Sequence, residues 1–221
     1  MKLFLNAVIK FLVGIIFIGA LVFLPSGSFH YRGGRLFCAL LFIPVFIMGV
    51  VLFVKAPDLL KSRLDGNETE KTQKGVVLLS AVIFIAGFVT AGLDFRYGWS
   101  RVPIFVTVAA SVIFLGSYAL YAEVMRENAY LSRTIGVKDG QTVVDSGLYG
   151  IVRHPMYAAT IIMFLAVPLI LGSFWALIPF VFYPAVIVVR ILNEEKVLTA
   201  ELKGYAEYKL KVKYRIIPFI W

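Results

Sequence analysis

The sequence predicts an all-α, polytopic integral membrane protein that crosses the bilayer about six times. Of its 221 residues, 60% are hydrophobic and only 16% are charged, whereas an ordinary soluble domain is roughly 45–50% apolar and 25% charged. Long apolar stretches recur along most of the chain, and no soluble-looking block separates them. A water-soluble fold cannot enclose this much apolar surface, so we expect one membrane domain with a short polar tail.

Six segments approach the roughly 20 apolar residues that a helix needs to cross a hydrocarbon core of roughly 30 Å. The predicted spans are residues 5–24, 36–54, 75–93, 103–122, 155–171 and 174–192. The first segment resembles a signal peptide because Lys2 precedes it, but Lys10 interrupts it and no small-residue cleavage site follows. We therefore expect it to remain as a membrane anchor.

The basic residues predict the orientation of these spans. Of the 22 Lys and Arg residues, 18 fall on one side of the predicted spans, together with both termini. The positive-inside rule places this side in the cytoplasm. The formal net charge of +9 is then a topology signal and an attraction for anionic membrane lipids, and it does not indicate a nucleic-acid partner. The single cysteine, Cys38, excludes an intrachain disulfide and a Cys-based metal site, and we expect no metal.

The polar residues divide the chain into two expected regions. Residues 1–122 carry four spans with few polar side chains, which indicates a transmembrane scaffold. Within it, the loop 55–74 contains Gly66 and Asn67 among mixed charges and predicts a solvated connection with a short interfacial helix and no chemistry. Polar groups gather at the cytoplasmic ends of the later spans, so residues 123–221 are expected to form a second region that carries a functional site.

Two polar clusters of this second region are expected to meet in one pocket. Pro155 disfavours helical geometry at His154 and suits the first position of a helix, so a span should begin there. The unpaired N–H groups of such a helix start can bind a carboxylate or phosphate. Only two residues, 172–173, join this span to the next. The tight hairpin returns Arg190 and Glu194, which share a helix face, to the same membrane side.

The C-terminal segment alternates apolar and charged residues. Residues 197–214 therefore predict an amphipathic helix that lies on the membrane surface. Tyr205, Tyr208 and Trp221 are expected at the depth of the lipid headgroups, where aromatic side chains are enriched.

Five short motifs follow one another through residues 123–221. They are Ser146-Gly147-Leu148-Tyr149, Arg153-His154-Pro155-Met156-Tyr157, Arg190 with Glu194-Glu195 and Leu198, Gly204-Tyr205-Ala206-Glu207-Tyr208, and Tyr214-Arg215-Ile216-Ile217-Pro218. In order and spacing they resemble the isoprenylcysteine carboxyl methyltransferase family, whereas the first half of the chain matches only as generic membrane spans. One position departs from the family motif, because Ala159 stands where glycine is usual.

The resemblance implies a methyltransferase that uses S-adenosylmethionine at the cytosolic interface. It assigns the cofactor to Gln141, Thr142, Val143, Val144, Tyr149, His154, Pro155, Met156, Tyr157 and Glu194. It assigns Arg190 to the methyl-accepting substrate, whose carboxylate this arginine would position. The implied acceptor is lipophilic, such as a prenylated cysteine, and enters from the bilayer among membrane lipids. The sequence leaves the oligomeric state of the protein open.

The residue chemistry fits carboxyl methylation. A carboxylate nucleophile is ionised at neutral pH and needs no general base, and an arginine such as Arg190 holds it with a forked pair of hydrogen bonds. Glu194 suits the positive ammonium and sulfonium of the cofactor, while the helix start at His154 suits its carboxylate. Membrane phospholipid methyltransferases share this style of motif, but an amine acceptor requires a base such as Glu195, and Arg190 would repel it.

Two further classes remain open from the sequence alone. Membrane sterol reductases have a similar C-terminal region and bind NADPH, whose extra phosphate calls for basic residues, but the loop 141–149 contains none. A non-enzymatic membrane scaffold or transporter would bind neither cofactor. The absence of charged residues deep in the first four spans argues against an ion pathway.

Overall fold

The computed structural model describes residues 1–66, 70–138 and 140–221, and the regular elements in these ranges are all helical. The longer helices are α1 (Lys2–Ser26), α2 (Arg32–Lys55), α4 (Lys71–Tyr97), α5 (Ile104–Glu127), α6 (Pro155–Leu171) and α8 (Tyr183–Glu201). The shorter elements are α3 (Pro57–Leu64), the 3-10 turn η1 (Gly147–Gly150), α7 (Leu177–Val181) and α9 (Tyr205–Lys211). The all-α prediction is confirmed, and Asn67 of the predicted loop lies outside the described residues.

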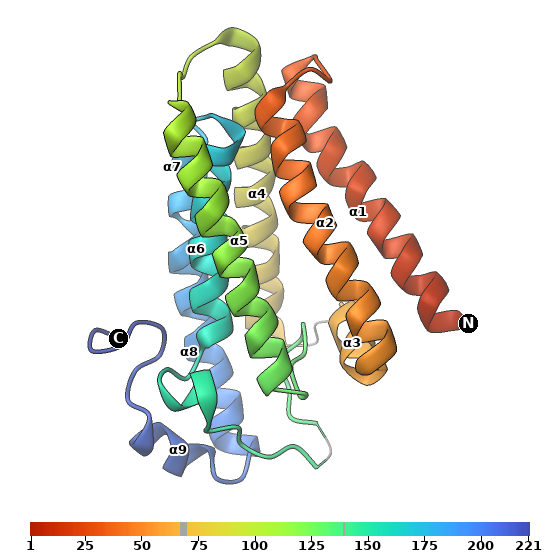
Figure 1. The fold of residues 1–221 in the computed structure, drawn as a ribbon. Coiled ribbons are helices and arrows are strands. Elements are labelled where there is room, and N and C mark those ends of the chain that lie inside the picture. The colour runs from red at the N-terminus through yellow and green to blue at the C-terminus, as the bar shows by residue number, and fades with distance from the viewer. Residues whose placement is uncertain (67–69, 139) are drawn as a thin grey trace.

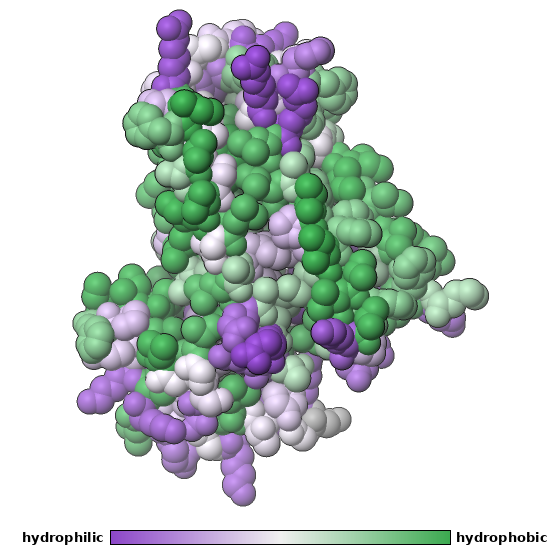
Figure 2. All heavy atoms as spheres, in the orientation of Figure 1, coloured by the Kyte–Doolittle hydropathy of each residue, from purple (hydrophilic) through white to green (hydrophobic). Residues whose placement is uncertain are grey.

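Five helical segments in the described ranges are long and apolar enough to cross a membrane. They are α1, α2, α4, α5 and the segment Leu177–Glu201, which α7 and α8 form together. The remaining predicted span is α6, an apolar helix of 17 residues, so the number six stays a prediction. Figure 2 shows hydrophobic side chains over the middle of the molecule and hydrophilic ones at both ends. The prediction of an integral membrane protein is confirmed.

Helix α6 lies inside the bundle rather than at its rim (Figure 1). Its side chains Val167 and Ile170 have no exposed surface, and they share a core with Phe37 of α2, Phe114 of α5 and Phe180 of α7. By contrast, the buried residues of the longer α1 are only Val22 and Ser26. Neighbouring helices thus fix α6 on several sides, and its first residues are held firmly at one end of the bundle.

A buried carboxylate fixes the opposite end of this bundle. Asp94, near the end of α4, is only 1% exposed. It accepts hydrogen bonds from the amide and the hydroxyl of Ser100, both at 2.6 Å, and from the hydroxyl of Ser173 at 2.5 Å. Ser173 lies in the connection between α6 and α7. Three donors satisfy the buried charge and tie α4 to the hairpin that was predicted from the sequence.

The C-terminal segment differs from its prediction. A single amphipathic helix over residues 197–214 is not confirmed, because α8 continues to Glu201 and α9 covers only seven residues. Gly204, with φ +88°, separates the two helices, and left-handed backbone of this kind favours glycine. Tyr205 and Tyr208 are 4% and 5% exposed and pack with Leu202, so they face the protein, and their depth in the membrane stays a prediction.

The packing of α4 against α7 generates a first prediction. A Cβ at Gly87 would lie 2.3 Å from ring atom Cε2 of Phe180, whereas a Cβ at Gly75 meets nothing within 4 Å. We expect Gly87→Ala to lower the free energy of unfolding by about 1–3 kcal/mol through overpacking. Gly75→Ala, in the same helix, should leave it unchanged or raise it, since alanine favours helix. Thermal unfolding in detergent, followed by circular dichroism, measures both, and equal losses would contradict the packing argument.

Candidate active site

A pocket opens at the end of the bundle where the α5–η1 connection, the start of α6, the end of α8 and helix α9 come together. Its lining includes nine of the ten residues that were assigned to a cofactor, together with Arg190. These nine are Gln141, Thr142, Val143, Val144, Tyr149, His154, Met156, Tyr157 and Glu194. Pro155 is buried as the first residue of α6 but is absent from the lining. The structure thus brings together residues that are up to 53 positions apart in the sequence.

Tyr157 connects the residue assigned to the substrate with the carboxylate assigned to the cofactor. Its hydroxyl donates a hydrogen bond of 2.5 Å to Oε2 of Glu194 and accepts one of 2.8 Å from Nε of Arg190. The Arg190 guanidinium also donates to the carbonyl of Arg133 at 2.8 Å and lies 5.8 Å from the centre of the Tyr157 ring. The predicted pairing of Arg190 and Glu194 is therefore bridged by a tyrosine of α6.

Glu195, the neighbour of Glu194, has a different role. Its Oε1 lies 2.7 Å from Nε of Arg153 and 3.2 Å from Nε2 of His154, and its Oε2 lies 3.0 Å from Nε of Arg215. The side chains of Glu195, Arg153 and His154 are each no more than 5% exposed. A buried carboxylate therefore holds the start of α6, the end of α8 and the C-terminal tail in one cluster, which we call the Glu195 cluster.

The two residues before α6 are bonded to the C-terminal tail. The amide of Arg153 donates to the carbonyl of Tyr214 at 2.9 Å, and the amide of His154 donates to the carbonyl of Arg215 at 2.8 Å. The Arg153 guanidinium also donates to the carbonyls of Val212 and Lys213, at 2.6 and 2.8 Å. These donors are already used inside the protein, so the amides of residues 153 and 154, which precede α6, are not offered to a ligand. The expectation that the first amides of the helix itself bind a carboxylate stays a prediction.

The loop that carries Val143 to Tyr149 is fastened on two sides. From α5, Glu127 accepts a hydrogen bond from the amide of Leu148 at 2.9 Å. From α9, the hydroxyl of Tyr208 donates to the carbonyl of Tyr149 at 2.7 Å. Next to them, Lys211 lies 2.6 Å from Asp145 and lowers the pKa of that carboxyl group by hydrogen bonding and charge. The loop is thereby positioned as one wall of the pocket.

Gly147 is required by the geometry of this wall. Its φ is +57°, and an added Cβ would lie 2.0 Å from Oε1 of Glu127. A side chain would therefore strain the backbone and displace the carboxylate that holds the loop.

The loop 55–74, predicted to carry no chemistry, contributes a residue beside the pocket. Arg63 of α3 donates to the carbonyl of Ser132 at 3.0 Å and to the hydroxyl of Tyr121, and it lies 3.9 Å from Sδ of Met156. Met156 and Ser132 line the pocket. The predicted short helix is present as α3, and it packs against Met125 and Leu131, while its position at the membrane interface stays a prediction.

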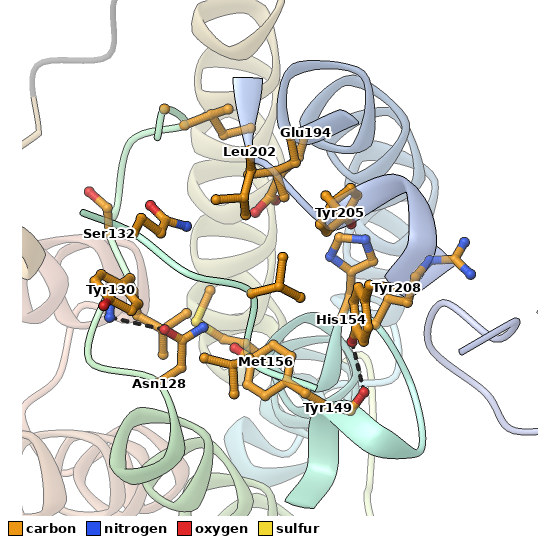
Figure 3. Close-up of a pocket in the computed structure, with 18 of the residues that line it drawn as sticks. Asn128, Tyr130, Ser132, Tyr149, His154, Met156, Glu194, Leu202, Tyr205 and Tyr208 are labelled. Atoms are coloured by element: carbon orange, nitrogen blue, oxygen red, sulfur yellow. Dashed lines mark hydrogen bonds between the residues drawn. The ribbon is translucent and has the colours of Figure 1, made fainter. Parts of the chain in front are cut away.

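Two groups of lining residues were not predicted from the sequence. They are Asn128, Tyr130, Leu131, Ser132, Thr134, Ile135 and Gly136 of the connection after α5, and Leu198, Leu202, Tyr205 and Tyr208 of the C-terminal segment. Figure 3 shows that Asn128 and Tyr130 lie on one side of the pocket, with Tyr205 and Tyr208 across from them. The connection has no periodic pattern that fixes its path, and the tyrosines fitted a membrane surface equally well.

Fold and site together define a helical integral membrane protein with a polar pocket at one end of its bundle. Comparison with known proteins shows that residues 108–200 match the isoprenylcysteine carboxyl methyltransferase (ICMT) family. This confirms the resemblance that the motifs indicated over residues 108–200, which are similar to the ICMT family, while the last two motifs lie beyond the match. The name of the family describes a methyltransferase. All ten residues assigned to the cofactor, and Arg190, fall within the matched region.

A curated relative with a different activity also matches. The Delta(14)-sterol reductase TM7SF2 of Mus musculus is 35% identical over 91 residues, which make up 40% of this chain. The match spans 22% of the length of that reductase.

The Glu195 cluster generates a second prediction. Glu195→Ala leaves Arg153 buried without its carboxylate, and breaking a buried ion pair in this way costs about 3–5 kcal/mol of unfolding free energy. Glu201→Ala, at the exposed end of the same helix, should change it by less than about 0.5 kcal/mol. Chemical or thermal unfolding in detergent compares the two variants. If they unfold alike, the cluster does not hold the three segments together.

Proposed function

We propose that this protein transfers a methyl group from S-adenosylmethionine to a carboxylate of a lipophilic acceptor at the cytosolic face of a membrane. The observation that carries this proposal is the chain Arg190–Tyr157–Glu194, which sets a guanidinium beside a carboxylate in one pocket. A guanidinium suits an acidic acceptor, and a carboxylate suits a positively charged methyl donor.

The residues present fit the cofactor. S-adenosylmethionine supplies a methyl group on a positively charged sulfur, which is transferred to a nucleophile by in-line displacement. Glu194 would hold its ammonium, and the apolar Val143, Leu198 and Leu202 of the lining offer surface for its uncharged parts. The family that residues 108–200 match supports the same donor, because methyltransferases generally use it.

Arg190 would position the acceptor. A carboxylate is already ionised at neutral pH, so the protein needs to align it and to exclude water rather than to remove a proton. The bridge through Tyr157 fixes Nε of Arg190 and thereby the plane of the guanidinium. Positioning of this kind is the main contribution that a protein can make to a displacement of a good leaving group.

The Glu195 cluster weighs against N-methylation of a phospholipid. Glu195 was the candidate base for an amine acceptor, but both of its oxygens are held by Arg153, His154 and Arg215. It is also absent from the lining of the pocket. A carboxylate paired with three cationic or hydrogen-bonding groups is a weak proton acceptor. Carboxyl methylation needs no such base and is the acceptor chemistry that we propose.

An NADPH-dependent reductase is the second candidate, and the mouse sterol reductase favours it. The extra phosphate of NADPH calls for basic groups, and Arg153 of the lining is already engaged by Glu195 and by two carbonyls. Calorimetric titration of the purified protein with both cofactors separates the candidates. We expect binding of S-adenosylmethionine; binding of NADPH alone would replace our proposal with the reductase.

Acceptor chemistry is tested by transfer of labelled methyl groups. We expect label in a prenylated cysteine with a free carboxylate and none when that carboxylate is blocked as an amide. Label that appears only in ethanolamine headgroups of added phospholipids would show N-methylation instead.

The proposed roles of Arg190 and Glu194 give a further prediction. Arg190→Lys keeps the charge but loses the planar fork, so methyl transfer should fall roughly a hundredfold while the Kd for S-adenosylmethionine stays within about twofold. Glu194→Gln removes the charge partner of the ammonium and should raise that Kd roughly tenfold or more. Calorimetry and a labelled-methyl assay measure both quantities. Equal loss of cofactor binding in the two variants would refute this division of roles.

A further inference from the structure

Helix α9 presents two tyrosines to the pocket, and their hydroxyls differ. The hydroxyl of Tyr208 donates to the carbonyl of Tyr149 at 2.7 Å. Tyr205 lines the pocket and is only 4% exposed. Its hydroxyl is buried and has no hydrogen-bond partner in the described part of the chain. A buried polar group without a partner is unfavourable, and it is found at sites where a ligand completes the hydrogen bond.

The surroundings of Tyr205 indicate which part of a ligand it meets. Figure 3 shows Tyr205 on the same side of the pocket as His154 and Glu194. Burial is the main cause that raises the pKa of this phenol, and the charges of Glu195 and Glu194 raise it further. The hydroxyl therefore stays protonated throughout the physiological range and acts as a hydrogen-bond donor beside the carboxylate that we assign to the cofactor ammonium.

Several donors near Glu194 are already used inside the protein. The sequence assigned the cofactor carboxylate to the start of α6, but the amides of Arg153 and His154 donate to carbonyls of the C-terminal tail. Nε2 of His154 lies 3.2 Å from Glu195. In an amino-acid ligand the carboxylate is attached to the carbon that carries the ammonium, so a donor close to Glu194 is suitably placed for it.

We propose that the Tyr205 hydroxyl donates a hydrogen bond to the α-carboxylate of the adenosylated amino acid whose ammonium Glu194 holds. This inference rests on the proposed function and deepens it, because it assigns a ligand-binding role to a residue of the C-terminal segment. Tyr205 would then determine cofactor specificity, because it favours methyl donors that keep their α-carboxylate over methyl donors that have lost it.

The test compares Tyr205→Phe with Tyr208→Phe by calorimetry and thermal unfolding of the full chain in detergent. Tyr205→Phe removes a hydroxyl that has no protein partner, so the melting temperature without ligand should stay unchanged or rise. Its Kd for S-adenosylmethionine should increase roughly ten- to hundredfold, as expected for a hydrogen bond to a charged group. Tyr208→Phe loses the bond to Tyr149 and should lower the melting temperature without ligand.

A second ligand assigns the contact to the carboxylate. Decarboxylated S-adenosylmethionine keeps the ammonium, the sulfonium and the adenosine, so Tyr205→Phe should change its Kd by less than about twofold. An equal loss for both ligands would overturn the assignment to the carboxylate. An unchanged Kd for S-adenosylmethionine, or a fall in ligand-free melting temperature like that of Tyr208→Phe, would overturn the role of Tyr205. If the unsubstituted protein binds neither ligand, the proposed function itself fails.

Discussion

The site depends on one buried carboxylate. Glu195 holds Arg153, His154 and Arg215, and through them it fixes the start of α6 and the C-terminal tail against α8. Near a membrane the guanidinium groups of Arg153 and Arg215 would otherwise lie in surroundings that solvate them poorly, so the cluster constrains the chain strongly. The tail can then supply carbonyls to the amides of residues 153 and 154. The pocket is built on top of this arrangement.

Adjacent glutamates have separate duties because a helix turns about 100° from one residue to the next. Glu195 faces the interior of the protein, where it binds Arg153, His154 and Arg215. Glu194 faces the pocket and accepts a hydrogen bond from Tyr157. The two arginines differ in the same way. Arg153 binds Glu195 and backbone carbonyls, whereas the Arg190 guanidinium binds Tyr157 in the pocket. One set of charges thus holds the segments together, and Arg190 and Glu194 are joined to each other through Tyr157 in the pocket.

Much of this arrangement could be predicted from the sequence because its signals are local. Pro155 marks the helix start, and the short connection that contains Ser173 forces a hairpin, which returns Glu194 to the same end of the bundle. What could not be predicted depends on contacts between distant segments. The alternation in residues 197–214 fits a helix on lipid or a helix on protein, and only packing against the loop 141–149 decides that Tyr205 faces inward. Arg63 likewise contacts Ser132 of the pocket lining, and no local pattern of the sequence encodes this contact between distant segments.

The length of α6 has a consequence for the function that we propose. Seventeen residues of α-helix span about 26 Å, which is less than the roughly 30 Å thickness of a typical hydrocarbon core. Because α6 is enclosed by longer helices, these helices meet the lipid, and α6 itself falls about 4 Å short of the core thickness. The polar head of a membrane-bound molecule then needs to rise only a small distance from its resting depth to meet the reactive groups, while its tail remains in contact with the acyl chains.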